Sequence, residues 1–293
     1  MNGSAQDAPP KNRYENAPRA ADFTIDQAWE TYTPEEHDRW DRLFRRQKDV
    51  TKGRACAAAL TAMEKLELSP SGIPHMGELS DKLEAITGWR VVPVAGLVPD
   101  EIFFEHLANR RFPAGAFIRP EAEFDYLQEP DIFHDIFGHV PLLADPVFAD
   151  FLEAYGKGGQ RAMQLGQLHN LARLYWYTVE FGLIREDDGL RIYGAGIISS
   201  PQETVFALED DSPNRIVFDL PRLMRTKYII DDFQQTYFVI DSFEALLDAC
   251  YKDFGDVYQQ VKGEPDYEAH EIAPGDEIIT RGTHAYFDAK AGT

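Results

Sequence analysis

Two closely spaced histidines are the first residues of this sequence whose types suggest metal chemistry. His134 and His139 lie five positions apart in the segment PDIFHDIFGHVP, residues 130–141. On an ideal α-helix this interval separates two side chains by about 140°, so the pair cannot share one face of an unbroken helix. We predict that the helix ends at Gly138, which can adopt the left-handed conformation, and that Pro141 prevents it from resuming. His139 would then turn back toward His134, although two histidines merely satisfied at a helix end are the alternative.

Glu180 is the third candidate ligand. Apolar residues recur at helical spacing from Leu165 to Leu183, and Glu180 has apolar neighbours on both sides. A carboxylate in this setting is largely buried, and without a partner it would cost several kcal/mol or become neutral, so it needs a cation. A salt bridge to Arg173 or Arg185 is one solution. The other is a metal, because two histidines and one carboxylate form the ligand set of non-haem Fe(II) oxygenases, which leaves coordination positions open.

Other cofactor classes have no motif in this sequence. It contains no HExxH pair of a zincin and no HxD followed by a distant histidine. It also contains no GxGxxG dinucleotide loop and no GxxxxGK[ST] phosphate loop. Reducing electrons would therefore come from something other than a Rossmann-bound nicotinamide.

Composition excludes several classes of partner. The 293 residues carry 29 Lys and Arg against 50 Asp and Glu, and the formal net charge of -21 repels nucleic acids and anionic membranes alike. The two cysteines, Cys56 and Cys250, are too few for a disulfide framework and lack CxxC spacing, so we expect reduced thiols. No apolar run resembles a signal peptide or reaches the roughly 18 residues of a membrane span. We expect a soluble, cytoplasmic protein.

The sequence predicts one mainly α-helical domain with minor β-structure. Residues 1–22 are rich in Ala, Asn, Pro and charged residues, so we expect a disordered leader before a catalytic domain over residues 23–270. Apolar spacing and capping residues predict one helix that begins near residue 34. They predict further helices over residues 55–66, 76–87, 100–107, 146–156, 159–183, 221–226 and 242–254. Short strands are predicted at residues 89–93, 117–119, 190–193, 205–208 and 236–240.

Three longer motifs carry a resemblance to a known family. FHDIFGHVPLL, YWYTVEFGL and YGAGIISSPQE occur in the order and at the spacing of the pterin-dependent aromatic amino acid hydroxylases, and EHDRWDRLFRRQ and VVPVAGLVPDEIFF extend the similarity. It covers the chain from Phe23 to about residue 265. The resemblance implies a basket-like helical catalytic domain, with short strands, around a non-haem iron site. It is similar to the bacterial form without a regulatory domain, so we expect a monomer in which residues 271–293 form a tail without a tetramerisation helix.

The resemblance also implies roles for individual residues around the iron. His134, His139 and Glu180 match the iron ligands. The cofactor, tetrahydrobiopterin or a related tetrahydropterin, would be bound by Gly96, Leu97 and Phe103, with Asp135 and Ala172 nearby. Phe103 would supply a stacking face, although core packing alone would also explain an aromatic residue there. Asp135 stands where animal members have glutamate, which puts a direct contact to the pterin in doubt.

A second set of residues matches the amino acid pocket. Arg119 corresponds to the arginine that binds the substrate α-carboxylate, a task suited to the guanidinium fork, whereas the alternative is an ordinary surface arginine. Val239 stands where phenylalanine-hydroxylating members carry an apolar residue and tyrosine-hydroxylating members an acidic one. The remaining matches are the aromatic walls and the loop that closes over the substrate: Trp176, Phe181, Gly196, Ser199 and Ser200. For the two serines, turn chemistry alone is the alternative.

The implied reaction is the hydroxylation of L-phenylalanine to L-tyrosine by O2 and a tetrahydropterin at one Fe(II) ion. No side-chain nucleophile is expected, because the metal and the cofactor supply the chemistry. Two alternatives are open. The substrate could be tryptophan or tyrosine, or the chain could be a non-catalytic pterin- or metal-binding module that keeps the fold.

Overall fold

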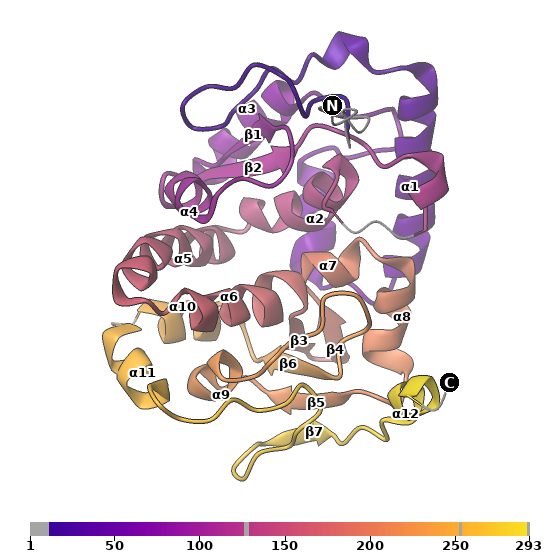
Figure 1. Cartoon of the computed structure of the whole chain (residues 1–293). Coiled ribbons are helices and arrows are strands. Elements are labelled where there is room, and N and C mark those ends of the chain that lie inside the picture. Colours follow the sequence, from indigo (N-terminus) through magenta and orange to yellow (C-terminus); the bar gives the residue numbers. More distant parts are fainter. Residues whose placement is uncertain (1–11, 126–128, 252–253, 292–293) are drawn as a thin grey trace, which may run out of the picture.

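Helices make up most of the molecule. The computed structural model in Figure 1 describes residues 12–125, 129–251 and 254–291. Its α-helices are α1 (Pro34–Thr51), α2 (Ala57–Lys65), α3 (Met76–Thr87), α4 (Asp100–Ala108), α5 (Pro146–Leu165), α6 (Leu168–Tyr175), α7 (Ala195–Ile198), α8 (Pro201–Glu209), α9 (Leu220–Met224), α10 (Phe243–Tyr251), α11 (Phe254–Val261) and α12 (Ala285–Ala291). The short 3-10 helices are η1 (Trp29–Thr31), η2 (Glu121–Glu123) and η4 (Val140–Ala144), and the π-helices are η3 (His134–His139) and η5 (Trp176–Glu180). The predicted fold class, mainly α with minor β, is confirmed.

Two small sheets lie in different parts of the molecule (Figure 1). The strands are β1 (Arg90–Val94), β2 (Arg111–Gly115), β3 (Leu183–Glu186), β4 (Gly189–Ile192), β5 (Asn214–Val217), β6 (Thr236–Ile240) and β7 (Ile278–Thr280). Strands β1 and β2 pair in parallel, with Arg90 opposite Arg111. The second sheet has the order β4-β3-β6-β5-β7, in which β6 is parallel to both β3 and β5. Helices α5, α6 and α10 lie between the two sheets in this view.

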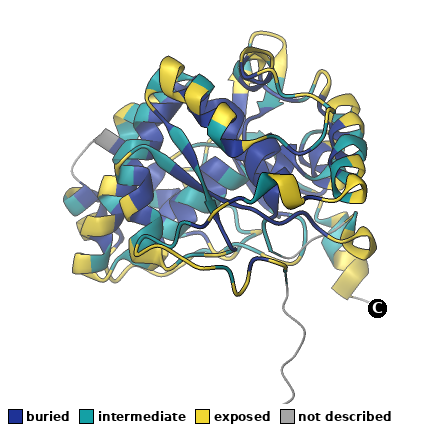
Figure 2. Cartoon of the chain, turned by 90° about the horizontal axis from the view of Figure 1, so that it is seen from above, coloured by how far each residue is buried: buried dark blue, intermediate teal, exposed yellow. Residues whose placement is uncertain are grey.

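Helix α1 anchors the segment that carries the two histidines. It begins where the sequence predicts, because Thr33 and Glu36 form a reciprocal capping box and Pro34 occupies the first turn. Its apolar stripe faces inward, where Trp40 lies edge-on to Phe133 with ring centroids 5.6 Å apart. Helices throughout the molecule are buried toward the middle and exposed outside (Figure 2). None of the helices in the described residues is long and apolar enough to cross a membrane.

Several predicted boundaries are wrong. Helix α5 does not stop at Gly156 but continues to Leu165 and ends at Gly166, which has a φ of 66°. Residues 205–208 are helical rather than extended, because Ser200 and Pro201 start α8 just before them and override the local β propensity. Residues 117–119 are not a strand, since the pairing with β1 is made by β2 a few residues earlier.

Both ends of the described chain pack on the domain. Residues 1–11 lie outside the described residues, but within 12–22 the Tyr14 side chain is only 4% exposed and donates to Gln27 O at 2.7 Å. The expected disorder of the leader therefore does not hold for residues 12–22. At the other end, β7 pairs with β5, and Tyr286 of α12 packs against Phe206. Cys56 and Cys250 are both buried and unpaired, as expected.

We predict that Gly156→Ala lowers the free energy of unfolding by about 1–3 kcal/mol, the usual cost of overpacking. A Cβ atom at Gly156 would lie 2.4 Å from the backbone nitrogen of Ala108, where α5 crosses α4. Urea denaturation measures the change. Gly158→Ala is the matched control on the same helix, because its Cβ would meet only two ring carbons of Phe254, at 3.3 and 3.5 Å. Equal stability of the two variants would contradict the prediction.

Candidate metal centre

A π-helix brings the two histidines together. In η3 the backbone N–H of Val140 donates to Asp135 O, five residues earlier, and this wider turn places His134 and His139 on one face. Their Nε2 atoms lie 3.1 Å apart. The predicted break at Gly138 is wrong, because Gly138 has no left-handed backbone and the helix runs on into η4, whose second residue is Pro141. The glycine serves another purpose, since a Cβ there would lie 2.9 Å from Ala195 O of α7.

Glu180 completes a cluster of three donor atoms. It is the last residue of the second π-helix, η5, in which Phe181 N donates to Trp176 O at 2.8 Å. Glu180 Oε1 lies 3.1 Å from His139 Nε2, and Oε2 lies 3.6 Å from His134 Nε2. Ligand atoms bound at right angles about 2.1 Å from one metal ion are about 3.0 Å apart, so the cluster fits a single ion.

Neither Arg173 nor Arg185 forms a salt bridge with Glu180, because each arginine pairs with another carboxylate. Arg173 forms a two-pronged ion pair with Asp266, at 2.7 and 2.6 Å. Arg185 lies 3.3 Å from Asp241. Within the described residues, the groups within 4 Å of the Glu180 carboxylate that can carry positive charge are therefore the two imidazoles.

The charges of these groups suit a divalent cation. Burial lowers the pKa of His134 to about 4, so this imidazole is neutral and free to act as a ligand. Burial also disfavours a charged His139, but the Glu180 carboxylate outweighs it and raises the pKa of His139. Burial opposes the charge of Glu180, yet His139, His134 and the Gly196 backbone N–H together keep the pKa of Glu180 low. A carboxylate and a neutral imidazole are ready-made ligands.

Asp135 is a competing candidate, because its carboxylate also lies within 4.8 Å of ligand atoms of His134 and His139. Its Oδ2, however, accepts a hydrogen bond from Gly115 N at 2.6 Å, at the end of β2. Burial raises the pKa of Asp135 to about 7, whereas that of Glu180 is lowered. The ionised ligand is thus better supplied by Glu180.

Asp131 connects the metal cluster to Arg119. Arg119 donates to the Asp131 carboxylate through Nε at 2.9 Å and Nη2 at 2.8 Å, and the same carboxylate accepts from the backbone N–H of His134 at 3.0 Å. Arg119 is only 5% exposed, so the surface alternative does not apply. Burial raises the pKa of Asp131, but the guanidinium outweighs this effect and keeps the residue ionised. Sequence reasoning missed Asp131, although its position three residues before His134 is typical of a capping carboxylate.

Aromatic rings form a wall beside Glu180. Trp176 and Phe181 pack with ring centroids 4.8 Å apart. Tyr228 stacks on Trp176, with ring centroids 4.4 Å apart and an angle of 20° between the ring planes. Val239 is fully buried on the central strand β6, opposite Leu183 of β3. The sequence contained no signal for Tyr228, because it lies in a loop about 50 residues from its partner.

The serine loop contacts the cluster directly. Ser199 Oγ lies 2.8 Å from His134 Nδ1, and because His134 Nε2 faces the other ligands, Nδ1 carries the proton and donates to the serine. Gly196 lies so close to Glu180 that a Cβ atom would be 3.1 Å from Oε2. Ser200 does not reach the cluster; it caps α8 by accepting from Glu203 N at 3.3 Å.

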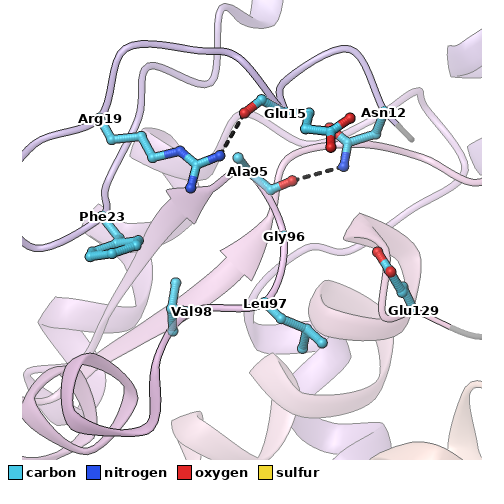
Figure 3. Close-up of a pocket in the computed structure, with 9 residues that line it drawn as sticks. All are labelled: Asn12, Glu15, Arg19, Phe23, Ala95, Gly96, Leu97, Val98 and Glu129. Atoms are coloured by element: carbon cyan, nitrogen blue, oxygen red, sulfur yellow. Dashed lines mark hydrogen bonds between the residues drawn. The ribbon is translucent and has the colours of Figure 1, made fainter. Parts of the chain in front are cut away.

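The residues predicted to bind the pterin fall into two groups. Phe103 packs edge-on to Tyr175, with centroids 5.6 Å apart, and Tyr175 in turn lies parallel to the His139 ring at 6.1 Å. Ala172 lies on α6, one turn before Trp176. Gly96 and Leu97 instead line a pocket of about 230 Å³ between the loop after β1 and residues 12–23, with Leu97 pointing outward (Figure 3). Phe103, Asp135 and Ala172 do not line that pocket.

Comparison with known proteins identifies the family. Residues 10–262 match the family model of biopterin-dependent aromatic amino acid hydroxylases. The chain belongs to this family. It is 60% identical over 268 residues to a phenylalanine-4-hydroxylase of Caulobacter vibrioides, covering 92% of this chain and 91% of that protein. It is 53% identical to one of Chromobacterium violaceum, covering 90% and 89% of the two chains.

Solved structures agree with this membership of the hydroxylase family. The crystal structure of the Chromobacterium violaceum phenylalanine hydroxylase with iron(III) and 7,8-dihydrobiopterin has a TM-score of 0.86 to this chain. The two sequences are 53% identical, and the match covers 89% of this chain and 95% of that one. The protein is thus a pterin-dependent monooxygenase of this hydroxylase family.

We expect Ser199→Ala to weaken binding of a divalent metal by about 10- to 100-fold, because a hydrogen-bonded partner orients a ligating imidazole. Competition with a chelator measures the affinity. Ser200→Ala is the control: it removes only the cap of α8, at about 1 kcal/mol of stability, and should leave metal affinity unchanged. The assignment fails if both serine variants bind metal equally well.

Proposed function

We propose that this protein is a phenylalanine 4-monooxygenase, which converts L-phenylalanine to L-tyrosine with O2 and a tetrahydropterin at a mononuclear Fe(II) site. The observation that carries the proposal is the convergence of His134, His139 and Glu180, with donor atoms 3.1 to 3.6 Å apart, beside an aromatic wall. Relatives that are 53–60% identical over most of the chain are named phenylalanine-4-hydroxylases.

In this proposal the three residues hold Fe(II) on one side and leave its other positions open. The iron and the pterin together supply the activation of O2 and the hydroxylating power. The protein would hold the ligands in their charge states, exclude water with the half-buried aromatic wall, and direct the substrate ring toward the metal. Ser199 fixes the tautomer of His134 by accepting its Nδ1 proton.

Arg119 is the proposed partner of the substrate α-carboxylate. Asp131 occupies the edge formed by Nε and Nη2, and no hydrogen bond within the described residues uses Nη1. The edge formed by Nη1 and Nη2 is therefore available for a carboxylate. Because Asp131 also holds the backbone of His134, the bound amino acid and the metal would keep a fixed relative position.

We propose that Gly96, Leu97 and Phe103 bind the pterin, with Asp135 and Ala172 nearby. The chain of rings from Phe103 through Tyr175 to His139 supports this, because it places Phe103 only two ring contacts from a metal ligand. The pocket at Gly96 and Leu97 would then receive the polar substituent of the pterin rather than its ring system.

Phenylalanine is proposed over tyrosine because Val239 is apolar and fully buried, so no acidic group there meets a phenolic hydroxyl. The ratios of kcat/KM for the three amino acids test this choice, and a preference for tryptophan would reject it.

We further propose that the enzyme acts in the cytoplasm as a monomer, without nucleic-acid or membrane partners. It would consist of one catalytic domain over residues 23–270 and a tail over residues 271–293, and of these flanking segments residues 12–22 and 271–291 pack on the domain. The two buried free thiols and the net charge of -21 support the location and the absence of those partners. The tail uses its apolar side chains within the chain, where Phe287 and Tyr286 meet Phe206.

The sharpest test of the iron assignment is Glu180→Gln. We expect this change to lower iron binding and to abolish tyrosine formation, because a neutral amide replaces the anionic ligand of a dication. Iron content and product formation are measured together, and circular dichroism at 222 nm should be unchanged. Glu186→Gln, a half-buried glutamate on the neighbouring strand β3, is the control and should keep both properties. Retained hydroxylation by Glu180→Gln would reject the assignment.

A further inference from the structure

The indole N–H of Trp176 is held by a buried amide. Trp176 Nε1 donates to Gln234 Oε1 at 2.9 Å, and Gln234 is 1% exposed. An indole nitrogen is only a donor, so the atom that faces it must be the amide oxygen, and Gln234 Nε2 must point the other way. There it donates to Ile229 O at 2.7 Å, which closes the turn that follows Tyr228. One amide thus holds both the tryptophan ring and the turn beside it.

Gln234 is held in place by Glu203. The backbone N–H of Gln234 donates to Glu203 Oε1 at 3.2 Å, and the Tyr237 hydroxyl donates to the same oxygen. Glu203 lies in the first turn of α8, immediately after the serine loop, and is 6% exposed. Its carboxyl group therefore joins α8, the loop before β6 and β6 itself.

Glu203 lacks the partner that a buried carboxylate usually has. Among the described residues, no basic side chain forms an ion pair with it, although burial without a cation is costly. Burial raises the pKa of Glu203 to about 7, so the neutral acid is well populated near neutral pH. In either protonation state Oε1 accepts the two hydrogen bonds, and an apolar residue would leave two buried donors unsatisfied.

Three contacts together leave the Trp176 ring little freedom. The ring centroids of Tyr228 and Phe181 lie 4.4 and 4.8 Å from that of Trp176. The Gln234 amide oxygen accepts a hydrogen bond from the indole N–H. Rotation of the indole about its side-chain bonds would break the hydrogen bond and both ring contacts. Holding a reactant within a few tenths of an ångström is what separates productive from unproductive geometry in a reaction of this kind.

We propose that Glu203 and Gln234 are positioning residues of the amino acid pocket, which fix the Trp176 indole and the Tyr228 turn and so determine which aromatic ring the site accepts. The inference rests on the proposed function, in which Trp176 forms a wall of that pocket. Neither residue touches the metal cluster within the described contacts, so their effect on the reaction is transmitted through Trp176.

The first test is Gln234→Leu, which keeps the side-chain volume but removes the acceptor of the indole N–H. We expect KM for phenylalanine to rise roughly 5- to 20-fold, and the tyrosine formed per pterin oxidised to fall, because a mobile wall presents the ring poorly. The preference for phenylalanine over tryptophan, as a ratio of kcat/KM values, should fall about tenfold. Iron content should stay at the wild-type value.

Gln235→Leu is the matched control. It makes the same change at the adjacent residue, whose side chain has no hydrogen bond within the described part of the chain, and it should behave as wild type. Trp176→Phe removes the donor of the same hydrogen bond, whereas Gln234→Leu removes its acceptor. In a double-mutant cycle, Gln234→Leu should therefore raise KM less in a Trp176→Phe protein than in the wild type, because only the hydrogen bond to Ile229 O remains to be lost.

The pair Glu203→Gln and Glu203→Leu tests the other half of the network and serves if Gln234→Leu fails to fold. Glutamine keeps an acceptor oxygen and should restore wild-type KM, whereas leucine should reproduce the kinetics of Gln234→Leu. A spectroscopic readout is the fluorescence difference between each protein and its Trp176→Phe counterpart, which isolates Trp176. It should shift to the red in Gln234→Leu and Glu203→Leu only.

The outcomes separate the two proposals. Wild-type protein that makes no tyrosine refutes the proposed function, and the positioning role in the reaction falls with it. If the wild type is active, the positioning role is refuted when Gln234→Leu matches Gln235→Leu within twofold in KM, product ratio and Trp176 emission. It is also refuted when Glu203→Gln is as impaired as Glu203→Leu, because the acceptor is then not what matters.

Discussion

The metal cluster depends on a change in backbone hydrogen bonding from i→i+4 to i→i+5. On a regular α-helix His134 and His139 would diverge, but the wider turn of η3 places their Nε2 atoms 3.1 Å apart. A second π-helix ends at Glu180 and turns its carboxylate toward them. Such turns are weaker than α-helical ones, so both must be held by their surroundings. The close approach of α7 to Gly138 and the packing of Phe137 on Phe44 hold the first.

The buried polar groups around the cluster satisfy one another in two hydrogen-bonded sets. Asp131 binds Arg119 and the backbone of His134, Ser199 binds the His134 ring, and Glu203 binds Gln234, which holds Trp176. A partly satisfied set of this kind would cost more than an apolar core. When all of these hydrogen bonds are formed, each helix or strand that contributes to them is held in a single position. The same hydrogen bonds that stabilise the fold therefore also orient the metal ligands and the aromatic wall.

Residue types and motif order led to the proposed ligands His134, His139 and Glu180, but not to the geometry that brings them together. The apolar surroundings of Glu180 predicted a buried carboxylate that needs partners, and two imidazoles lie within 4 Å of it. The mode of convergence was mispredicted, because a five-residue interval fits a helix break or a π-helix equally well and no local signal separates them. The choice is made by α7, which packs on η3 from about 60 residues away. Tyr228, Gln234 and Glu203 were missed for the same reason, since their roles exist only once β6 and α8 meet.

Residues 12–22 show how composition misleads when a few large side chains decide the outcome. The segment is polar enough to predict disorder, yet Tyr14 buries its ring and bonds Gln27 O, and Asn12 donates to Ala95 O at 3.0 Å. The Asn12 contact lies beside the loop that carries Gly96 and Leu97 (Figure 3). Ordering this short segment therefore also shapes one wall of the pocket there. If the pterin substituent binds in that pocket, as we propose, it would contact a segment whose composition alone predicts disorder.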